Sequence, residues 1–221
     1  MFHEIKYMAR LNHPFIIKMR GVSQDNRNMF ILMDYLPQGE LMNVLKIYKR
    51  MSPELCRFYT AQVLLCFEYL HSNDYIYRDL KPENVLVQNS GFIKLTDFGF
   101  LKKLAPHDRT YTLCGTPEYM APEVIMNTGH GQAADWYTLG IFMYELLVGR
   151  PPFMHNDTYE VFKMTLRTKI PFPTCVHADA KSLIKHLTAH DLSKRYGHRV
   201  AGVNEIKNHR FFSTTHWQKL I

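Results

Sequence analysis

The first 36 residues combine one short helical pattern with two strand-like patterns. Apolar residues recur at helical spacing over residues 2–11. Residues 15–22 and 29–35 are strand-like runs, and the polar stretch SQDNRN between them favours a hairpin turn. After Pro37 and Gly39 the character changes to helices. The pattern therefore predicts a small strand-bearing piece in front of a helical body.

A long helix is predicted next. Ser52 and Pro53 suit an N-cap and a first helical residue, and the pattern runs to about His71. Its apolar residues would form one buried stripe: Leu55, Phe58, Val63, Phe67 and Leu70. Between residues 75 and 100, short strand-like pieces alternate with loops.

Three more helices are predicted in the C-terminal half. Residues 136–148 are apolar almost all round, which indicates a central buried helix. Asp157 with Glu160 suits a capping box for the next helix, and residues 178–187 give one more. The predicted fold class is α+β, with a mainly helical body and a small N-terminal piece.

Composition changes this picture little. The chain has 221 residues, of which 46% are hydrophobic and 21% charged, as in an ordinary globular domain. A formal net charge of +7 could attract nucleic acid, acidic lipid or an acidic partner. Because the basic residues are scattered and form no long run, a solvated basic surface is the favoured interpretation, and nucleic acid is not expected as a partner.

The cysteines and the apolar runs bear on the compartment. The four cysteines lie too far apart for a CxxC metal knuckle and are too few for a disulfide scaffold, so a reducing cytosol or nucleus is expected. The opening MFHEIKYMAR carries charges where a signal peptide has an apolar core. The most apolar run, residues 139–149, is short and contains Glu145, so no membrane span is expected.

Two motifs carry the chemistry. Residues 77–84 spell YRDLKPEN, and Asp97, Phe98 and Gly99 begin thirteen residues after Asn84. Phosphoryl transfer requires a positioned oxygen nucleophile and counter-charge around an anionic group, and two carboxylates and an amide can supply both. A lone DFG is more often an ordinary turn, but the two motifs together, each flanked by apolar strand-like residues, make coincidence implausible.

Each residue of these motifs has an expected role. Asp79 would orient the substrate hydroxyl and accept its proton, and Lys81 would neutralise the transferred phosphate. Asn84 and Asp97 would hold Mg²⁺ through hard oxygen ligands, with ATP as co-substrate.

A third motif, GTPEYMAPE at residues 115–123, extends the match. With it, the chain resembles the AGC-family Ser/Thr protein kinases of the cyclic-AMP-dependent type from HEIKYMARLNHPF to IKNHRFFSTTHW. The resemblance implies a transferase with a protein kinase-like fold. Residues 1–36 would be a partial N-lobe with helix C, two strands and the hinge, and residues 37–221 would be the C-lobe.

The resemblance also implies the roles of other residues. Thr116 would bridge Asp79 and Lys81 as part of the catalytic group. Thr112 would be phosphorylated and its charge received by Arg78 and Lys102, the alternative being an unmodified loop threonine. ATP would be bound by Met33, Asp34, Leu36, Glu40, Leu86, Thr96 and Asp97. Four residues would be structural: Glu4, Glu123, Asp135 and Arg195.

Substrate selection follows from the same resemblance. The implied substrate-binding residues are Glu40, Glu83, Leu113, Pro117, Met120 and Glu145. Several glutamates would select arginines before the phosphoacceptor, because a guanidinium pairs bidentately with a carboxylate. For any one glutamate alone, a solvated surface role is the simpler interpretation. A cAMP-binding regulatory subunit or a pseudosubstrate inhibitor is the implied partner.

The sequence departs from the family pattern at its N-terminal side. Neither a Gly-rich loop nor a strand lysine precedes the helix of residues 2–11, so the chain is expected to be N-terminally truncated and Glu4 to lack its partner. Apolar residues would then face water or a partner: Phe2, Ile5, Phe15, Ile17, Phe30 and Leu32. The alternative function is a catalytically inactive binding module for regulatory or inhibitor proteins.

Overall fold

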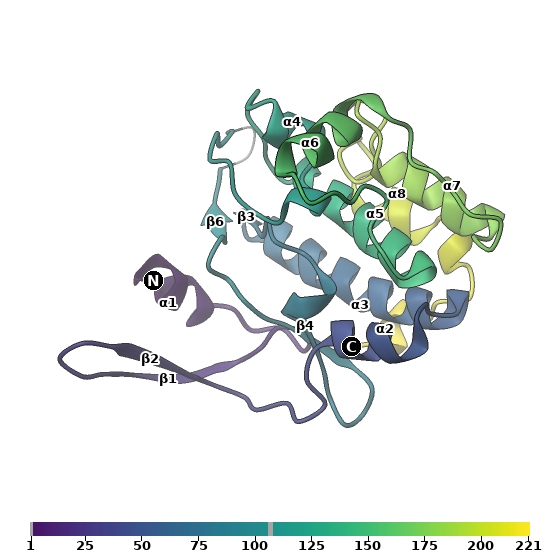
Figure 1. Cartoon of the computed structure of the whole chain (residues 1–221). Coiled ribbons are helices and arrows are strands. Elements are labelled where there is room, and N and C mark those ends of the chain that lie inside the picture. The colour runs from purple at the N-terminus through teal and green to yellow at the C-terminus, as the bar shows by residue number, and fades with distance from the viewer. Residues whose placement is uncertain (1, 106–107) are drawn as a thin grey trace.

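The computed structural model describes residues 2–105 and 108–221, and it consists of a helical body from which a small N-terminal piece projects (Figure 1). The N-terminal elements are α1 (Phe2–Met8), β1 (Met19–Gln24) and β2 (Met29–Met33). The elements that follow up to the middle of the chain are α2 (Leu41–Tyr48), α3 (Pro53–Ser72), β3 (Tyr75–Ile76), η1 (Pro82–Asn84), β4 (Val85–Val87), β5 (Ile93–Leu95) and β6 (Lys102–Lys103). The remaining elements are η2 (Pro117–Tyr119), α4 (Pro122–Ile125), α5 (Ala133–Val148), α6 (Thr158–Arg167), α7 (Ala178–Leu187), α8 (Val203–Lys207), η3 (Arg210–Phe212) and η4 (Trp217–Lys219).

The predicted hairpin is confirmed, with altered strand limits. β1 and β2 pair antiparallel, and the Asp25 carboxylate accepts the backbone N–H groups of Arg27 (2.7 Å) and Asn28 (2.6 Å) in the turn. The first strand starts later than predicted, because residues 15–17 leave the hairpin and run beside β5. The backbone N–H of Leu95 donates to the carbonyl of Phe15 (2.7 Å), and that of Ile17 donates to the carbonyl of Leu95 (2.9 Å).

This arrangement corrects part of the predicted exposure. Phe15 and Ile17 are each only 3% exposed, since their segment packs into the helical body, so the prediction that they face water is wrong. Phe30 and Leu32 are 49% and 51% exposed, as predicted. Ile5 is half-buried, and the side chain of Phe2 lies outside the described residues. Of these predicted residues, the ones found exposed among the described side chains therefore lie on the hairpin.

Three helices form the centre of the body. α3 begins where predicted, with the Ser52 hydroxyl accepting the backbone N–H of Leu55 (3.3 Å). Leu55 itself is exposed, not part of the buried stripe, because it lies on the outer side of the first turn. α5 is buried along nearly its whole length and starts three residues earlier than predicted. It packs between α3 and α7, and Gly140 permits the close approach of α7, since a Cβ there would lie 2.6 Å from Cγ2 of Thr188.

The two remaining predicted helices are also present. α7 spans residues 178–187, as expected. α6 has the predicted N-cap, with the Asp157 carboxylate accepting the backbone N–H of Tyr159 (2.9 Å). The reciprocal half of the capping box is wrong, because the Glu160 carboxylate pairs with Lys163 (3.2 Å) one turn further along instead. No helix within the described ranges has both the length and the apolar character needed to cross a bilayer.

Candidate active site

A short β ladder brings the two chemical motifs together. β4 and β5 pair antiparallel, with Val85 opposite Leu95. Asn84 directly precedes β4 and Thr96 directly follows β5, and the backbone N–H of Thr96 donates to the carbonyl of Asn84 (2.9 Å). The amide of Asn84 and the carboxylate of Asp97 therefore come from adjacent backbone segments at one end of this ladder.

Asp79 is at the centre of a buried polar cluster. One carboxylate oxygen accepts the hydroxyl of Thr116 (2.8 Å), and the other accepts the side-chain N–H of Asn84 (3.0 Å). The Lys81 ammonium lies 3.2 Å from Asp79 and donates to the Thr116 hydroxyl (3.1 Å). The bridge expected of Thr116 is thus present, and four predicted catalytic residues form one hydrogen-bonded group.

Asp135 fixes the backbone of the YRDLKPEN segment, residues 77–84, which we call the catalytic loop. Its carboxylate accepts the backbone N–H groups of Tyr77 (2.9 Å) and Arg78 (2.8 Å), and it also lies 2.7 Å from Nε2 of His71. Asp135 is 0% exposed, so these interactions are shielded from water. Arg78 has a φ of 74°, a left-handed conformation that a non-glycine residue adopts only when its surroundings impose it. Sequence reasoning missed His71, because nothing local marks it as the partner of an aspartate 64 positions away.

Tyr77 connects the catalytic loop to the DFG segment. Its hydroxyl donates to the carbonyl of Thr96, and its ring packs edge-on against Phe98 with centroids 5.6 Å apart. Burial raises the pKa of this phenol well above its usual value, and the nearby charges of Asp79 and Asp97 raise it further. Tyr77 therefore stays protonated and acts as a fixed donor between the two segments.

The residues predicted to hold Mg²⁺ fit a hard cation. Asn84 turns its amide nitrogen toward Asp79, donating to both its carbonyl (2.8 Å) and its carboxylate, which leaves the amide oxygen on the other side of the group. Asp97 is exposed, and in the described part of the chain one of its oxygens accepts the backbone N–H of Gly99 (3.2 Å). Amide and carboxylate oxygens are ligands that Mg²⁺ prefers, with phosphate oxygens completing its shell.

Arg78 and Lys102, the residues expected to receive a phosphate on Thr112, each bind another group in the segment of residues 100–112. Thr112 is exposed, whereas the Lys102 ammonium donates to the hydroxyl of the buried Thr110 (2.9 Å). Arg78 donates from Nε to the carbonyl of Phe100 (2.8 Å). Arg78 and Lys102 thus flank this segment, but their hydrogen bonds recorded among the described residues go to groups other than Thr112.

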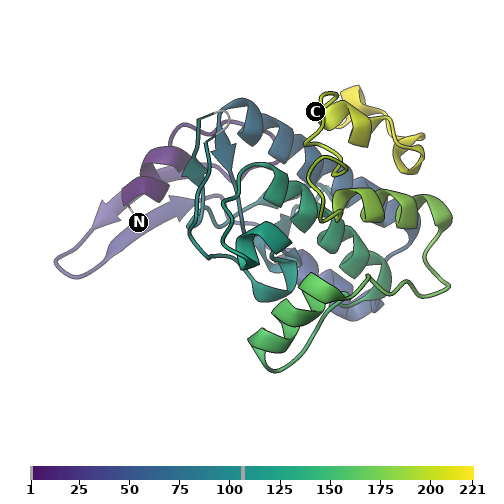
Figure 2. The same ribbon diagram turned by 90° about the horizontal axis from the view of Figure 1, so that it is seen from above.

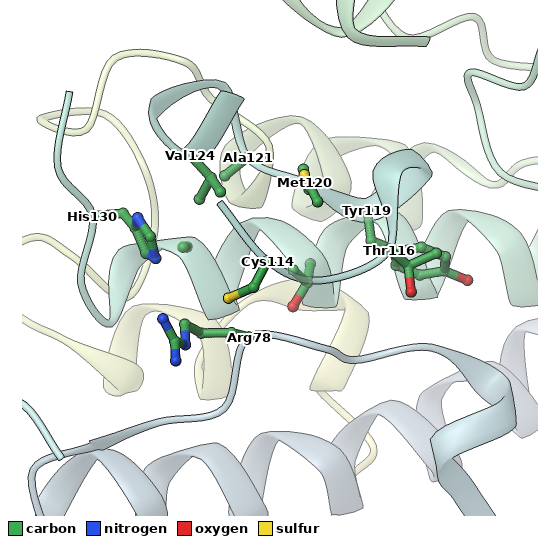
Figure 3. Close-up of a pocket in the computed structure, with 10 residues that line it drawn as sticks. Arg78, Cys114, Thr116, Tyr119, Met120, Ala121, Val124 and His130 are labelled. Atoms are coloured by element: carbon green, nitrogen blue, oxygen red, sulfur yellow. The ribbon is translucent and has the colours of Figure 1, made fainter. Parts of the chain in front are cut away.

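A small cavity lies behind the catalytic loop (Figure 3). With a volume of ≈ 10 Å³, it has room for about one water molecule. Three buried polar atoms of residues that line it have no hydrogen-bond partner within the described chain: Nη1 of Arg78, Nε2 of His130 and the hydroxyl of Tyr119. Burial, followed by the charge of Arg78, lowers the pKa of His130. Sequence reasoning did not single out His130.

The predicted nucleotide-binding residues lie on a more open face. Met33 is exposed and Tyr35 is 88% exposed, while Leu36, Leu86 and Thr96 are half-buried. Asp34 pairs with Arg20 of β1 (2.5 Å), and the backbone of Glu40 bridges that of Leu86. A groove of ≈ 470 Å³ beside the hinge is lined by Asp34 and Leu36 but also by Gln88 and Lys94, so it covers only part of the predicted ATP set.

Acidic residues gather at the side of the site expected to bind substrate. Glu145 is buried, and one of its carboxylate oxygens has no hydrogen-bond partner among the described residues. Its pKa is raised to about 8, mainly by burial and to a smaller extent by the negative charges of Glu83 and Glu118. Glu118 was not predicted, although it lies within the recognised GTPEYMAPE motif. Of the apolar residues predicted here, Met120 is buried, Pro117 half-buried and Leu113 exposed.

A buried ion pair between Glu123 of α4 and Arg195 lies next to this region and links α4 to other parts of the helical body. Both carboxylate oxygens of Glu123 accept N–H groups of Arg195, at 2.5 and 3.0 Å, so two of the residues predicted to be structural bind each other. Arg195 also donates to the backbone carbonyls of Ala133 (3.1 Å) and Ala189 (2.8 Å) and stacks over Tyr137. The pair ties α4 to the start of α5. Glu4, the fourth predicted structural residue, lies outside the residues whose side chains are described.

Comparisons with known proteins agree with this geometry. A family model described as a protein kinase domain matches residues 1–212. The chain is 45% identical over 218 residues to the cAMP-dependent protein kinase catalytic subunit PRKX of Mus musculus, covering 99% of this chain and 61% of that protein. It is 44% identical over 218 residues to the cAMP-dependent protein kinase type 3 of Saccharomyces cerevisiae, covering 99% and 54%. It is 43% identical over 217 residues to the cAMP-dependent protein kinase catalytic subunit of Dictyostelium discoideum, covering 98% and 33%.

The chain therefore spans between one third and about three fifths of the length of these relatives. The α+β fold, the cluster around Asp79 and the family match lead to one assignment. The chain belongs to the protein kinase family.

Proposed function

We propose that the chain transfers the terminal phosphoryl group of ATP to a serine or threonine hydroxyl of protein substrates. The observation that carries this proposal is the buried group in which Asp79 binds Thr116, Asn84 and Lys81. Three polar contacts hold one carboxylate in a fixed orientation, as proton transfer from a positioned hydroxyl requires. The division into a partial small lobe, residues 1–36, and a large lobe, residues 37–221, is part of the same proposal.

Each residue has a chemical role in this reaction. Asp79 orients the acceptor hydroxyl and takes its proton as the oxygen attacks. Lys81, held beside Asp79 and Thr116, places a positive charge against the transferred phosphoryl group. Asn84 and Asp97 would hold Mg²⁺, which supplies neutralisation of phosphate charge when bound. The hinge residues Asp34 to Leu36 would meet the adenine.

The substrate class follows from the acidic residues. Glu83 and Glu118 place negative charge beside Glu145, which favours basic residues before the acceptor. A guanidinium bound there would lower the pKa of the Glu145 carboxyl and favour its charged form. Leu113, Pro117 and Met120 would contact the residue that follows it. A cAMP-binding regulatory subunit or a pseudosubstrate inhibitor would occupy the same groove with its own basic segment, and phosphorylation of Thr112 would order the activation segment through Arg78 and Lys102.

A second candidate function is supported by the exposure of the nucleotide-facing edge. With Met33 and Tyr35 open to solvent, ATP would gain little enclosure from this face. The chain would then act as a catalytically inactive module that binds regulatory or inhibitor proteins through its acidic groove. Both candidates use the same groove and differ only in turnover.

One experiment separates the two candidates. Folded, purified chain is incubated with radiolabelled ATP, Mg²⁺ and an arginine-rich serine peptide, and unfolding temperature is measured with and without ATP and Mg²⁺. The kinase proposal expects Mg²⁺-dependent labelling, lost in Asp97→Ala and kept in the matched surface variant Asp157→Ala. The absence of both labelling and an ATP-dependent shift from folded protein would overturn the kinase proposal and leave the binding module.

A further inference from the structure

A second groove lies on the helical body, between the C-terminal end of α6 and helix α7. Its volume is ≈ 490 Å³, and it is lined by Leu166, Arg167, Thr168, Lys169, Ile170, Phe172, Lys185, Thr188 and His190. The floor and walls include apolar side chains, and every ionisable side chain on this lining is basic. Figures 1 and 2 both show α7 on the side of the body away from the β1–β2 hairpin.

The basic side chains of this groove form no ion pairs within the described chain. Arg167, Lys169 and Lys185, which line the groove, and Lys181, which lies beside it on α7, make no ion pair among residues 2–105 and 108–221. By contrast, Lys163, one turn before the groove on α6, is paired with Glu160 (3.2 Å). Unpaired cations around a concave surface produce a positive potential that is complementary to an acidic ligand.

Phe172 lines the groove and contacts two neighbouring lysines. The ammonium groups of Lys181 and Lys185 lie 5.4 and 6.0 Å from the centre of the Phe172 ring. Phe172 packs edge-on against Tyr144 of α5 (5.7 Å), and the Tyr144 hydroxyl donates to the carbonyl of Pro171 (2.7 Å). Phe172 is therefore anchored to the buried core while it holds two lysines on its outer side.

Helix-dipole effects account for only some of these basic residues. Arg167 and Lys185 lie in the last turns of α6 and α7, where positive charge is favourable. Lys181 lies in the N-terminal half of α7, where positive charge is unfavourable, and Lys169 lies beyond the end of α6. The helix dipole therefore does not account for the charge of Lys169 on the groove lining or for that of Lys181 beside it.

We propose that this groove is a docking site for an acidic peptide segment of a partner protein, with carboxylates over the lysines and an apolar side chain against Ile170 and Phe172. A peptide fits better than a bilayer or a nucleic acid duplex, because either of these would touch the rim and leave the apolar lining in water. The site is separate from the acidic groove proposed for basic substrates, so binding here does not depend on turnover.

The test uses a fluorescein-labelled peptide of about twelve residues with Glu and Asp around a central Leu, and fluorescence polarisation without ATP. The groove variant is Lys169→Glu with Lys185→Glu, and the control is Lys46→Glu with Arg50→Glu on exposed positions of α2 and the turn after it. Each pair changes the formal charge from +7 to +3, because each substitution removes two units, so non-specific attraction falls equally. Thermal unfolding confirms that both variants are folded.

The expected result is binding by the unchanged chain, weakened about tenfold or more in the groove variant and less than about threefold in the control. A milder variant, Phe172→Leu, removes the ring beside the two lysines but keeps an apolar side chain in the groove, and it should weaken binding about two- to threefold. The proposal would be overturned if the unchanged chain did not bind the peptide, or if both charge variants lost binding equally. It would also be overturned if the unchanged chain bound anionic vesicles and not the peptide, and the groove variant lost this vesicle binding. Because the readout is peptide binding, failure of the kinase proposal would leave it unaffected.

Discussion

The catalytic loop and the β1–β2 hairpin flank the same candidate active site but are stabilised in opposite ways. In the loop, buried polar side chains bind one another and the backbone, with Asp135 reaching from α5 to residues 77 and 78. In the hairpin, apolar side chains such as Phe30 and Leu32 remain about half exposed, and the Asp34 carboxylate is held by a surface arginine. The difference indicates that the helical body sets the geometry of the cluster around Asp79, whereas the edge proposed to bind the nucleotide is only weakly constrained by it.

The largest expected effect is the loss of the Asp135 carboxylate. Asp135→Ala should lower the free energy of unfolding by about 3–5 kcal/mol, because two buried N–H groups and His71 lose their acceptor at once. The matched variant is Asp34→Ala, whose carboxylate pairs with an exposed arginine and should change the free energy by less than about 1 kcal/mol. Urea denaturation measures both values, and similar losses in the two variants would remove the contrast between loop and hairpin.

The second prediction compares two phenylalanines of the N-terminal piece. Phe15 is buried and stacks on Phe92 with centroids 5.9 Å apart, so Phe15→Ala should lower the free energy of unfolding by about 3–5 kcal/mol. Phe30→Ala on the hairpin should lower it by less than about 1 kcal/mol and should reduce self-association, which light scattering measures. A large loss from Phe30→Ala would show that the hairpin is part of the cooperative core.

The third prediction concerns the pH dependence that Glu145 contributes. Because its pKa is raised from 4.5 to about 8, the folded chain keeps a proton that the unfolded chain releases, so stability is full below pH 4.5 and falls as pH rises toward 8. Glu145→Gln should remove this fall and make the chain about 1–3 kcal/mol more stable at pH 9, with little change at pH 4.

A matched control for Glu145 is Glu160→Gln, an exposed carboxylate paired with Lys163 on α6. Its unfolding free energy should change by less than about 1 kcal/mol at either pH. Denaturation at pH 4 and pH 9 provides the measurement. If Glu145→Gln followed the same pH dependence as the unchanged chain, the pKa of the Glu145 carboxyl would be the same in the folded and unfolded chain, and the proposed protonated state would be wrong.

The local signals in the sequence predicted the helical body well. Capping residues and hydrophobic periodicity predicted the limits of α3 and α7 close to where the structure has them. This was possible because a capping side chain such as Ser52 binds a backbone N–H only three residues away, so the signal is local. Long-range competition explains the errors. Residues 15–17 look like the start of a strand but bond to Leu95 instead, and Glu160 bonds to Lys163 and not to its own N-cap. Neither choice can be read from a local window.

The candidate site was predictable to a similar extent. Motif spacing located Asp79, Asn84 and Asp97, and the structure shows why they converge, since β4 and β5 pair immediately after Asn84 and before Thr96. The supports were harder to predict, because His71 reaches Asp135 across 64 positions and Glu118 affects Glu145 only through the folded arrangement. These interactions depend on how helices pack, and a single sequence does not contain that information.

The smallest expected effect is at the Arg20–Asp34 pair, which ties β1 to the hinge. Most of the Arg20 side chain is in water, so the pair is screened and ordering it offsets much of its attraction. A double-mutant cycle with Arg20→Ala and Asp34→Ala should give a coupling free energy below about 1 kcal/mol that declines further in high salt. A coupling above about 2 kcal/mol that persisted in salt would mean that the hinge is held as firmly as the catalytic loop, because only a pair shielded from water keeps its strength when counterions are added.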